Sequence, residues 1–540
     1  MSAQTRISAV LTAMILVGAS SCRTTPSGST SPTSAPAQVV QASAEPFELP
    51  ILFTSDEHGW LEPHLSDEGR AYEGGMAYLL GHWKGAFDYK PERFLVLSGG
   101  DAWTGPYEST VLHGAPVVAF MNLAGYDAQI IGNHDFDFGA DVLLTRAREA
   151  HYPLLAANLH RVSSTVRPPY AVGQAVSHVN GRRIGIVGLA NLDTPVVTHP
   201  RNVAGLAFSP LEGALRREVA ALRATAVDVV VAVIHEPVEE LLPLVPVFRE
   251  LGISFVGSGH SHHRGLTVDP GSDPTTADDV VVCNPGPYAR AFCHVTLRFA
   301  GQPPRLMGHD EDIVQVRGRI DAPTYPPDEA ALAIVQHARD SASSAGAEVL
   351  ASTAQGLSRG DPDQRLGHLV VDAWLEALPQ AQVAITNAGG LRQDIDVGDI
   401  SMRTLVGVLP FDNYLLLVEL TGAQLKKILA HPQTIAGGVR FRYRCNGDGT
   451  RQVIEVRDLN NKLLDDDKPY RVVVNEFIYR GGDRYRIREF DPHPEETALH
   501  WREPVARHLR QLTRDGKTAD LPIDGRARPT DEGSGCQPKD

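Results

Sequence analysis

The sequence predicts an α/β protein with two domains, on the evidence of two observations. From Phe47 to about Leu306, short apolar runs alternate with longer segments of helical character, the order that gives sheets covered by helices. A second series of helix and strand candidates follows residue 345, and a chain of 540 residues normally holds two or three cores. We therefore expect a layered α/β domain followed by a smaller α/β domain.

The composition is that of an ordinary globular protein. Hydrophobic residues make up 42% of the chain and charged residues 21%. The net charge of −15 and the pI near 5.8 argue against nucleic acid as a partner, because binding a phosphate backbone requires a basic face. Small anionic substrates remain possible, since metal ions or local positive charge can outweigh the global sign.

Residues 1–21 are predicted to be a signal peptide. A short polar start with Arg6 leads into the apolar run Ile7–Gly18, which is too short to span a bilayer. The small residues before Cys22 resemble the bacterial lipoprotein processing box, although Ala19 stands where that box usually has Leu. We expect lipidation at Cys22; the alternative is plain cleavage, with Cys22 lost or free.

Residues 22–46 are rich in Ser, Thr, Pro and Ala and are predicted to be a disordered tether. The expected location is therefore the bacterial cell envelope, as a lipoprotein facing the periplasm. Four cysteines remain in the mature chain, too few for a disulfide framework in a protein of this size. A local bridge between Cys283 and Cys293 stays open.

The apolar runs of the first domain are followed by residues of the types that bind metals. The runs and the residues that follow them are Leu49–Thr54 with Asp56 and His58, Phe94–Ser98 with Asp101, Ala128–Ile131 with Asn133 and His134, Val229–Ile234 with His235, and Ile253–Val256 with His260 and His262. In layered α/β folds the ligand crevice lies outside the carboxyl ends of the strands. Imidazole, carboxylate and amide ligands without thiolate suit Zn²⁺, Mn²⁺, Fe²⁺ or Co²⁺. Seven candidate ligands are too many for one tetrahedral ion and enough for two ions that share a bridging carboxylate.

These blocks resemble the calcineurin-like metallophosphoesterase signature in its secreted 5′-nucleotidase/UDP-sugar hydrolase form, over about Pro50–Gly525. The resemblance implies a four-layer αββα domain with its ligands at the carboxyl ends of strands, and two divalent metal ions. It also implies a ligand set: Asp56, His58 and His262 for one metal, Asn133, His235 and His260 for the other, and Asp101 as the bridge. His134 and Asp137 match the family's catalytic pair, in which His134 stabilises the phosphoryl group and the leaving oxygen while Asp137 orients its ring.

The sequence departs from the family pattern at three positions. Asp135 stands where many members have Glu, and Glu57 stands where Leu is common; both look tolerable, and we leave Asp135 out of the site. Glu236 follows His235 where the family often has a small or apolar residue. We expect its carboxylate to face solvent; the alternative is that it adjusts the charge of the metal site.

Two metal ions account best for the rate that the expected reaction requires. Uncatalysed hydrolysis of a phosphate monoester is so slow that an enzyme must raise its rate by up to about 10²¹-fold, whereas general acid–base catalysis raises a rate by about 10²–10⁴-fold. Two ions about 3.5–4 Å apart generate a hydroxide nucleophile and neutralise the phosphoryl oxygens. The metals, rather than His134 and Asp137, are therefore expected to be the main source of catalysis.

The first domain is expected to span residues 47–310, and a connector residues 311–345. Within the connector, Tyr325-Pro326-Pro327 breaks the chain, and Asp328–Ser341 has helical spacing of its apolar residues. An ordinary surface helix and the inter-domain helix of the family have the same sequence pattern, so both remain open.

The second domain is expected at residues 346–528, with a flexible tail at 529–540. A helix is predicted near Leu366–Leu378 and a strand at Gln382–Thr386, and three loops around residues 387–392, 409–413 and 475–483 resemble the family's nucleotide-specificity domain. The resemblance implies that Phe411 and Phe477 sandwich the base, that Asp483 binds the ribose hydroxyls, and that base or sugar is contacted by Asn387, Arg392 and Asn413. A further family arginine does not align cleanly, so that Arg359, Arg365 or neither fills its place.

The chain is accordingly expected to be an exported two-metal phosphohydrolase that releases phosphate from 5′-nucleotides. The alternatives are a UDP-sugar or 2′,3′-cyclic nucleotide hydrolase, a thiosulfohydrolase-like enzyme on the same scaffold, and a nucleotide-binding lipoprotein without turnover. The expected partner is a small nucleotide substrate and not nucleic acid, with membrane contact through the lipid anchor, and the expected assembly is a monomer.

Overall fold

The computed structural model describes residues 45–65, 72–271, 278–319, 322–342, 344–446 and 450–530. The predicted signal peptide, Cys22, nearly all of the tether and the end of the tail lie outside the described residues. Among the described helices there is none with the length and apolar character that crossing a membrane requires.

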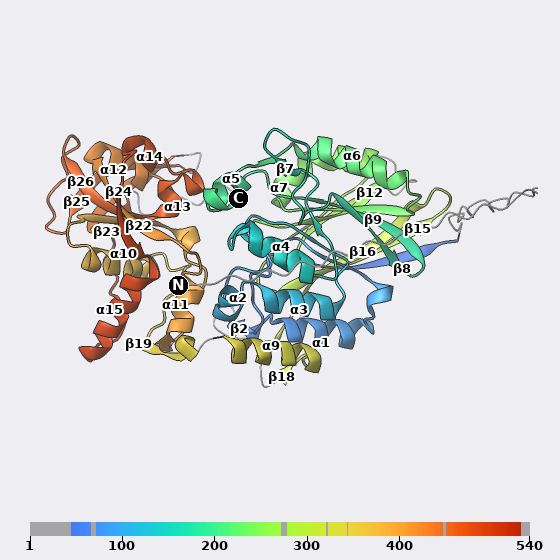
Figure 1. The fold of residues 1–540 in the computed structure, drawn as a ribbon, viewed down its shortest axis with the longest axis horizontal. Helices are drawn as coiled ribbons and strands as arrows, with labels where there is room; N and C mark the ends of the chain where they lie inside the picture. Colours follow the sequence, from blue (N-terminus) through green and yellow to red (C-terminus); the bar gives the residue numbers. More distant parts are fainter. Residues whose placement is uncertain are drawn as a thin grey trace, which may run out of the picture. The chain divides into compact units, whose positions relative to one another are not determined.

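Two six-stranded sheets form the centre of the first domain (Figure 1). In order, the first sheet contains β16 (Arg305–Gln315), β15 (Ala291–Ala300), β1 (Phe47–Thr54), β4 (Leu95–Ser98), β5 (Ala128–Ile130) and β6 (Leu154–Leu155). The second contains β13 (Gly265–Asp269), β14 (Val280–Asn284), β12 (Ile253–Ser258), β11 (Val229–Ile234), β9 (Arg182–Leu189) and β8 (Gln174–Val179). Strands β1, β4, β5 and β6 run parallel, as do β9, β11, β12 and β14, so that their carboxyl ends share an edge in each sheet.

The two sheets pack face to face around one apolar core. Phe53 of β1 meets Phe255 of β12 edge-on, with their ring centroids 5.9 Å apart. The buried run Val229–Ile234 is β-branched at most positions, as expected for a strand covered on both faces. A disulfide between Cys283 of β14 and Cys293 of β15 joins the sheets covalently, which settles the pairing that the sequence left open.

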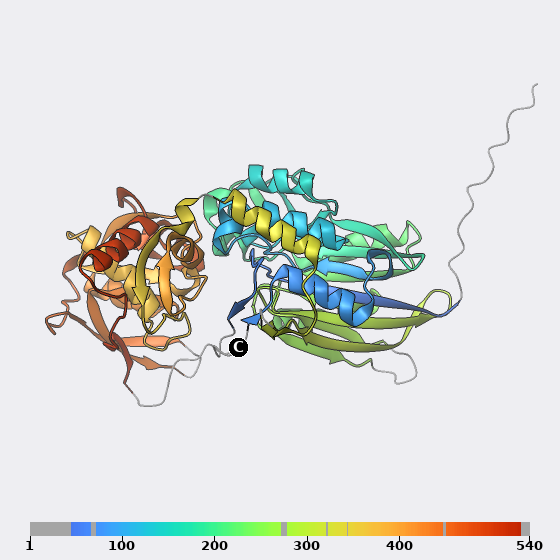
Figure 2. The same cartoon turned by 90° about the horizontal axis from the view of Figure 1, so that it is seen from below.

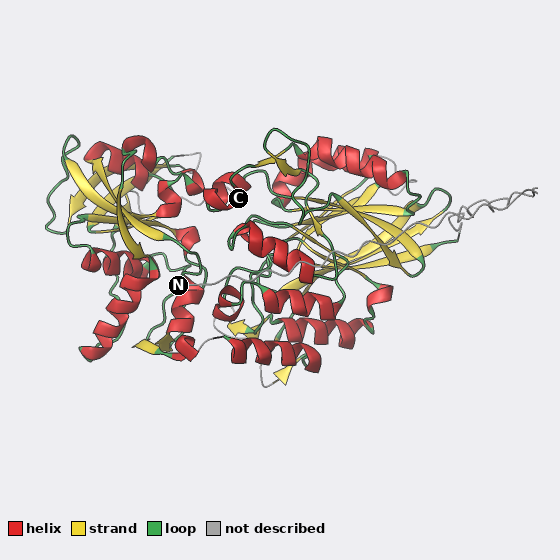
Figure 3. Cartoon of the chain, viewed as in Figure 1, coloured by secondary structure: helices red, strands yellow, loops and turns green. Residues whose placement is uncertain are grey.

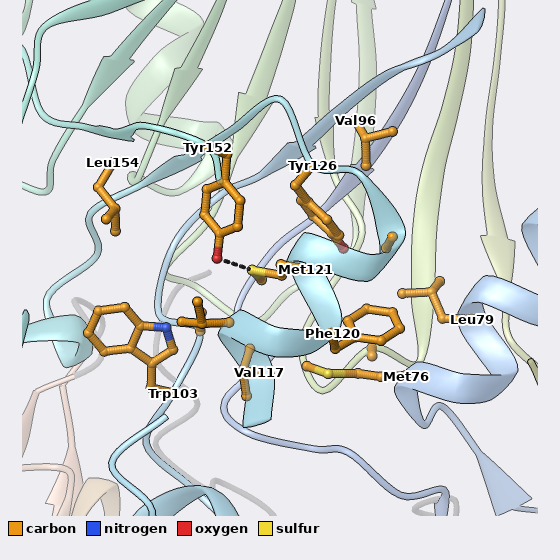
Figure 4. Close-up of a cluster of buried hydrophobic side chains, with 14 of the residues drawn as sticks. Met76, Leu79, Val96, Trp103, Val117, Phe120, Met121, Tyr126, Tyr152 and Leu154 are labelled. Carbon is orange, nitrogen blue, oxygen red and sulfur yellow. Dashed lines mark hydrogen bonds between the residues drawn. The ribbon is translucent and has the colours of Figure 1, made fainter. Parts of the chain in front are cut away.

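Helices cover the outer face of each sheet and complete four layers. The first sheet is covered by α1 (Met76–Phe87), α3 (Ala115–Ala124), α4 (Ala140–Glu149) and α9 (Glu329–Ser341), and the second by α6 (Leu211–Arg223), α7 (Val238–Leu241) and α8 (Val245–Glu250). Figure 4 shows the packing under α3, where the Tyr152 hydroxyl lies 3.1 Å from the sulfur of Met121. The predicted αββα layering is confirmed.

The predicted connector helix is present as α9. Asp328 caps its start by accepting a hydrogen bond from the backbone nitrogen of Ala331 at 2.9 Å. Ala331, Val335 and Ala338 are buried against α1 and α3, and Figure 2 shows α9 running beside α1. The helix thus belongs to the packing of the first domain, whereas the exact domain limits remain predictions.

The second domain is a smaller α/β unit (Figure 3). Its five-stranded sheet contains β23 (Thr434–Gly437), β20 (Val383–Asn387), β26 (Pro469–Asn475), β22 (Tyr414–Thr421) and β27 (Glu495–His500). One face packs on α10 (Arg365–Ala377) and α15 (Arg502–Arg514); the other packs on α12 (Gly422–Leu429) and on the small sheet of β25 (Arg451–Asp458), β24 (Val439–Cys445) and β28 (Ala527–Pro529). The predicted helix near Leu366–Leu378 and strand at Gln382–Thr386 are therefore confirmed, with small shifts at their ends.

Candidate active site

Three of the predicted ligands form a first group at the carboxyl ends of β1 and β12. These are Asp56, His58 and His262, whose ligand atoms lie within 4.8 Å of one another. The Nε2 atoms of His58 and His262 are 3.0 Å apart, and Nε2 of His262 is 3.5 Å from Oδ1 of Asp56.

A second group lies beyond β4, β11 and β12 and contains Asp101, His235 and His260. Nε2 of His235 is 3.2 Å from Oδ2 of Asp101. Asn133, which follows β5, joins this group because its Oδ1 is 2.9 Å from Nδ1 of His260. Asp101 also faces the first group, since the same Oδ2 is 3.9 Å from Nε2 of His58. The structure thus brings all seven predicted ligands together, with Asp101 between the two groups.

The chemistry of these donors fits two cations. Nδ1 of His58 lies 2.9 Å from the backbone carbonyl oxygen of Thr104, and Nδ1 of His235 lies 2.7 Å from that of Gly99. Because each Nδ1 donates to a carbonyl oxygen, each Nε2 presents its lone pair to the site. Nε2 of His235 is fully buried and, among the described residues, makes no hydrogen bond. Buried polar atoms normally have a partner, and a metal ion at this position would supply one.

The ligand loops have unusual backbone geometry. Five ligands lie in the left-handed region: Asp56 (φ 51°), His58 (φ 45°), Asp101 (φ 56°), His260 (φ 72°) and His262 (φ 61°). Such conformations are uncommon outside glycine and persist where the surrounding structure enforces them. Gly132 makes room for the bridge, because a Cβ at this position would lie 2.2 Å from Oδ1 of Asp101.

Asp135 holds two of the ligand loops through hydrogen bonds to their backbone, although the sequence predicted no role for it. Its carboxylate is fully buried and accepts hydrogen bonds from the backbone nitrogens of Asp101, Ala102 and Gly132 at 3.1, 2.9 and 2.8 Å. Gln129 donates a further bond at 3.3 Å. Asp135 therefore fixes the loop that carries Asp101 against the loop that carries Asn133.

Glu236 is buried, so the expectation that it faces solvent is wrong. Its side chain accepts hydrogen bonds from Asn191 Nδ2 at 2.7 Å and from the backbone nitrogen of Leu192 at 2.8 Å. Glu57 is buried as well and accepts hydrogen bonds from Thr54 and Ser98 at 2.5 and 3.1 Å. Local polar donors, rather than solvent, compensate these two carboxylates.

The predicted catalytic pair is in contact. Nδ1 of His134 lies 2.9 Å from Oδ2 of Asp137, and burial of the imidazole, which lowers its pKa, is outweighed by the carboxylates of Asp137 and Asp101, which raise the pKa of His134 above its usual value. The backbone nitrogen of His134 donates to Oδ1 of Asp101 at 2.7 Å. The ring of His134 stacks on Phe411, with centroids 5.4 Å apart and planes 18° from parallel.

One cavity of about 780 Å³ contains most of the predicted site. Its lining includes the ligands Asp101, Asn133, His260 and His262, the pair His134 and Asp137, and all six predicted substrate-binding residues, Asn387, Arg392, Phe411, Asn413, Phe477 and Asp483. Arg502, Gln433 and Thr198 also line it, and no sequence motif marked them. A volume of this size suits a small organic ligand.

Contacts within this cavity fix the predicted substrate-binding side chains. Asn387 Nδ2 donates to Oδ2 of Asp483 at 2.7 Å, and burial raises the pKa of the Asp483 carboxyl above its usual value. The ring of Phe477 lies against Gly482, where a Cβ would come within 2.4 Å of a ring carbon. Arg392 Nη2 donates to Nε2 of His58 at 3.0 Å, and its guanidinium is 5.9 Å from the centre of the Phe411 ring.

The two arginines that the sequence left as alternatives line a different cavity, of about 960 Å³. Arg359 donates to the hydroxyl of Tyr288 at 3.3 Å and pairs with Asp394. Arg365 pairs with Asp361 on the preceding turn. Among the described residues, neither arginine lines the cavity that contains the predicted substrate-binding side chains, and the choice between the three alternatives stays a prediction.

Comparisons with known proteins find similarity to 5′-nucleotidases. The family model described as the 5′-nucleotidase C-terminal domain matches residues 345–489. The 5′-nucleotidase of Mus musculus is 27% identical over 504 residues, which cover 82% of this chain and 85% of the mouse protein.

Two solved structures share the fold. A 5′-nucleotidase precursor from Thermus thermophilus superposes with a TM-score of 0.76 at 24% identity, covering 90% of this chain and 100% of that one. The sulfate thiohydrolase SoxB of Thermus thermophilus gives a TM-score of 0.71 at 20% identity, covering 91% and 97%. The chain is therefore similar to 5′-nucleotidases in its matched C-terminal domain, in sequence over most of its length and in its two-domain fold.

Proposed function

We propose that the protein is a metal-dependent phosphohydrolase that releases phosphate from 5′-nucleotides. One observation carries the proposal: members of both ligand groups, the His134–Asp137 pair and the aromatic side chains Phe411 and Phe477 border the same cavity. A phosphate at the ligand groups and a base at the aromatic rings would be two ends of one small molecule.

Asp56, His58 and His262 would hold one cation, and Asn133, His235 and His260 the other, with Asp101 between them. Cations of this kind supply a nucleophile at neutral pH and offset the charge on the phosphoryl oxygens. The ligand set excludes a thiolate site and suits Zn²⁺, Mn²⁺, Co²⁺ or Fe²⁺.

His134 would assist at the leaving oxygen. Its Nδ1 is held by Asp137 at 2.9 Å, so the protonated ring retains an Nε2–H that can donate to an anionic oxygen. The raised pKa of His134, for which the carboxylates of Asp137 and Asp101 are responsible, favours that protonated form. Its contribution is of the general acid–base kind, about 10²–10⁴ in rate.

Phe411 and Phe477 would bind the base by stacking, and Asp483 would accept from the ribose hydroxyls. The Asp483 carboxylate is held by Asn387, whose Oδ1 in turn accepts from Asn475 at 3.2 Å. Stacking contributes about 1–3 kcal/mol per base and discriminates poorly between bases. We therefore expect one enzyme to accept several nucleoside monophosphates.

The test is a panel of substrates with Mn²⁺ or Zn²⁺ added: AMP, UDP-glucose, 2′,3′-cyclic AMP, a simple phosphate ester and a thiosulfate ester. We expect kcat/KM for AMP to exceed that for the simple ester by about tenfold or more, from the stacking energy. Asp101→Asn should abolish turnover, and the matched control Asp141→Asn, an exposed carboxylate on α4, should not. Equal rates with AMP and the simple ester would overturn the nucleotide assignment, and preference for the thiosulfate ester would favour the thiosulfohydrolase alternative.

We also infer that the protein is exported and anchored through Cys22. The apolar run before Cys22 and the small residues next to it support this, as does the Cys283–Cys293 disulfide, because disulfides persist in oxidising compartments. Mass spectrometry of the N-terminal peptide from the membrane fraction tests the anchor. Cys22→Ala should move the protein to the soluble fraction; a variant that stays in the membrane would refute lipidation at this residue.

A further inference from the structure

The segment Asn191–Asn202, between β9 and β10 (Leu206–Phe208), reaches the predicted catalytic pair from one side. It contains the short helix α5 (Thr194–Val197), and Val197 and Thr198 line the site cavity. The sequence of this segment carries no feature typical of a catalytic site, and the proposed function uses none of its side chains.

Two side chains of the segment bond to Asp137. Thr198 Oγ1 donates to Oδ1 of Asp137 at 3.2 Å, and Asn202 Nδ2 donates to the backbone carbonyl of Asp137 at 2.9 Å. The other carboxylate oxygen, Oδ2, faces Nδ1 of His134 at 2.9 Å. Each oxygen of the Asp137 carboxylate therefore has its own partner, and rotation of that carboxylate breaks both bonds.

The start of the segment is anchored at a buried point. Asn191 and Leu192 donate to the two oxygens of Glu236 at 2.7 and 2.8 Å. Asn191 and Thr198 are each only 1% exposed, so the start of the segment and the residue that contacts Asp137 both lie inside the domain. A buried, hydrogen-bonded position of this kind allows few rotamers, which suits a group that orients another.

We propose that Thr198 is a positioning residue for the Asp137–His134 pair, held in place by the Asn191–Asn202 segment and its anchor Glu236. The proposal rests on the proposed function, in which His134 assists at the leaving oxygen. Thr198 fixes the plane of the Asp137 carboxylate, and that plane fixes the direction of the His134 ring. Misplacing an assisting group by about 1 Å lowers a rate by about 10²-fold.

The first arm of the test measures AMP hydrolysis by Thr198→Val, which removes the donor at nearly constant volume, and by Thr198→Ser, which keeps it. A hydrogen bond to a charged group corresponds to about 10- to 100-fold in rate. We expect Thr198→Val to lower kcat about tenfold with KM nearly unchanged, and Thr198→Ser to restore most of the loss. In an Asp137→Asn background, Thr198→Val should have little further effect; full additivity of the two losses would overturn the proposal.

The matched control is Thr194→Val in the same segment. Thr194 is buried too, and its hydroxyl donates to the carbonyl of Asn191 at 2.7 Å, away from Asp137. This variant removes a buried threonine hydrogen bond and should leave kcat within about twofold, because it leaves the Thr198–Asp137 bond in place. If Thr194→Val lowers kcat as much as Thr198→Val does, the segment acts through general stability and Thr198 has no positioning role.

The second arm is independent of turnover. The proton on Nδ1 of His134 should give a slowly exchanging, downfield NMR resonance in the wild type and in Thr198→Ser, and the resonance should broaden or vanish in Thr198→Val. An unchanged resonance in Thr198→Val would refute the positioning role. A wild type that shows the resonance and hydrolyses none of the panel substrates would instead refute the proposed function.

Discussion

Asp135 accepts a hydrogen bond from the backbone nitrogen of Asp101 at 3.1 Å, so a carboxylate outside the predicted ligand set holds the backbone of the predicted bridging residue. Asp135→Asn replaces one acceptor oxygen by an amide group that faces backbone N–H donors. We expect a loss of about 1–3 kcal/mol in unfolding free energy and of about 10- to 100-fold in metal affinity. Urea denaturation and metal titration measure these; wild-type metal affinity in Asp135→Asn would contradict the role.

The metal ligands should matter more for turnover than the assisting pair. Asp137→Asn is expected to lower kcat by at most about 10²–10⁴, the range of general acid–base catalysis. Asp101→Asn and His235→Ala should each cost more, because each removes a donor from the buried ligand groups. Steady-state kinetics with saturating Mn²⁺ compares the three variants, and similar losses from all of them would refute this division of labour.

Removal of metal should lower stability as well as activity. Among the described residues, the buried Nε2 of His235 makes no hydrogen bond, and the Nε2 atoms of His58 and His262 lie 3.0 Å apart. A bound cation would accept the lone pairs of these three nitrogens. At a free metal concentration of about 100 Kd, binding adds about 2.7 kcal/mol to the unfolding free energy. Thermal unfolding after chelation and after readdition of Mn²⁺ or Zn²⁺ measures the difference, and His235→Ala serves as the control that should respond weakly.

The aromatic side chains should control KM. Phe477→Ala is expected to raise KM for AMP by about one to two orders of magnitude, from the energy of base stacking. Gly482→Ala should act in the same direction while leaving the phenylalanine itself in the sequence, because the added Cβ would come within 2.4 Å of a ring carbon and displace Phe477. Initial-rate measurements over a range of AMP concentrations give both values, and an unchanged KM in Phe477→Ala would remove this residue from the site.

The disulfide should contribute stability without affecting catalysis. Cys283 and Cys293 are 10 residues apart and fully buried, and closing a loop of that size contributes about 2–3 kcal/mol. The double variant Cys283→Ala/Cys293→Ala should lose about that much in urea unfolding and keep kcat for AMP. A fall in kcat at full occupancy of the native state would show that the bridge also shapes the site.

The sequence was sufficient to predict the layered fold and which candidate ligands of the first domain lie close together. Both depend on local patterns: apolar runs set the strands, and residues directly after parallel strands reach one edge of a sheet. Asp56, Asp101 and His235 could be predicted in this way. The aromatic residues Phe411 and Phe477 required the family resemblance, because phenylalanine in a loop is otherwise most often part of a core.

The supporting residues could not be predicted, because their roles depend on tertiary burial. Asp135 and Glu236 look like exposed loop carboxylates in the sequence, and the structure buries both among backbone donors. Thr198 lies 61 residues along the chain from Asp137, in a segment that has no periodic pattern. No local signal marks which of several threonines will reach a carboxylate on another loop.

The left-handed backbone of five ligands has a consequence for how the protein can change over many generations. An L-residue in this conformation costs about 1–2 kcal/mol, a penalty that glycine escapes. Replacing Asp56 or His262 by glycine would therefore relax the loop while deleting a ligand. Selection for thermal stability alone should therefore favour glycine at these positions and yield a more stable protein without activity. Selection for turnover is what retains the predicted ligands there.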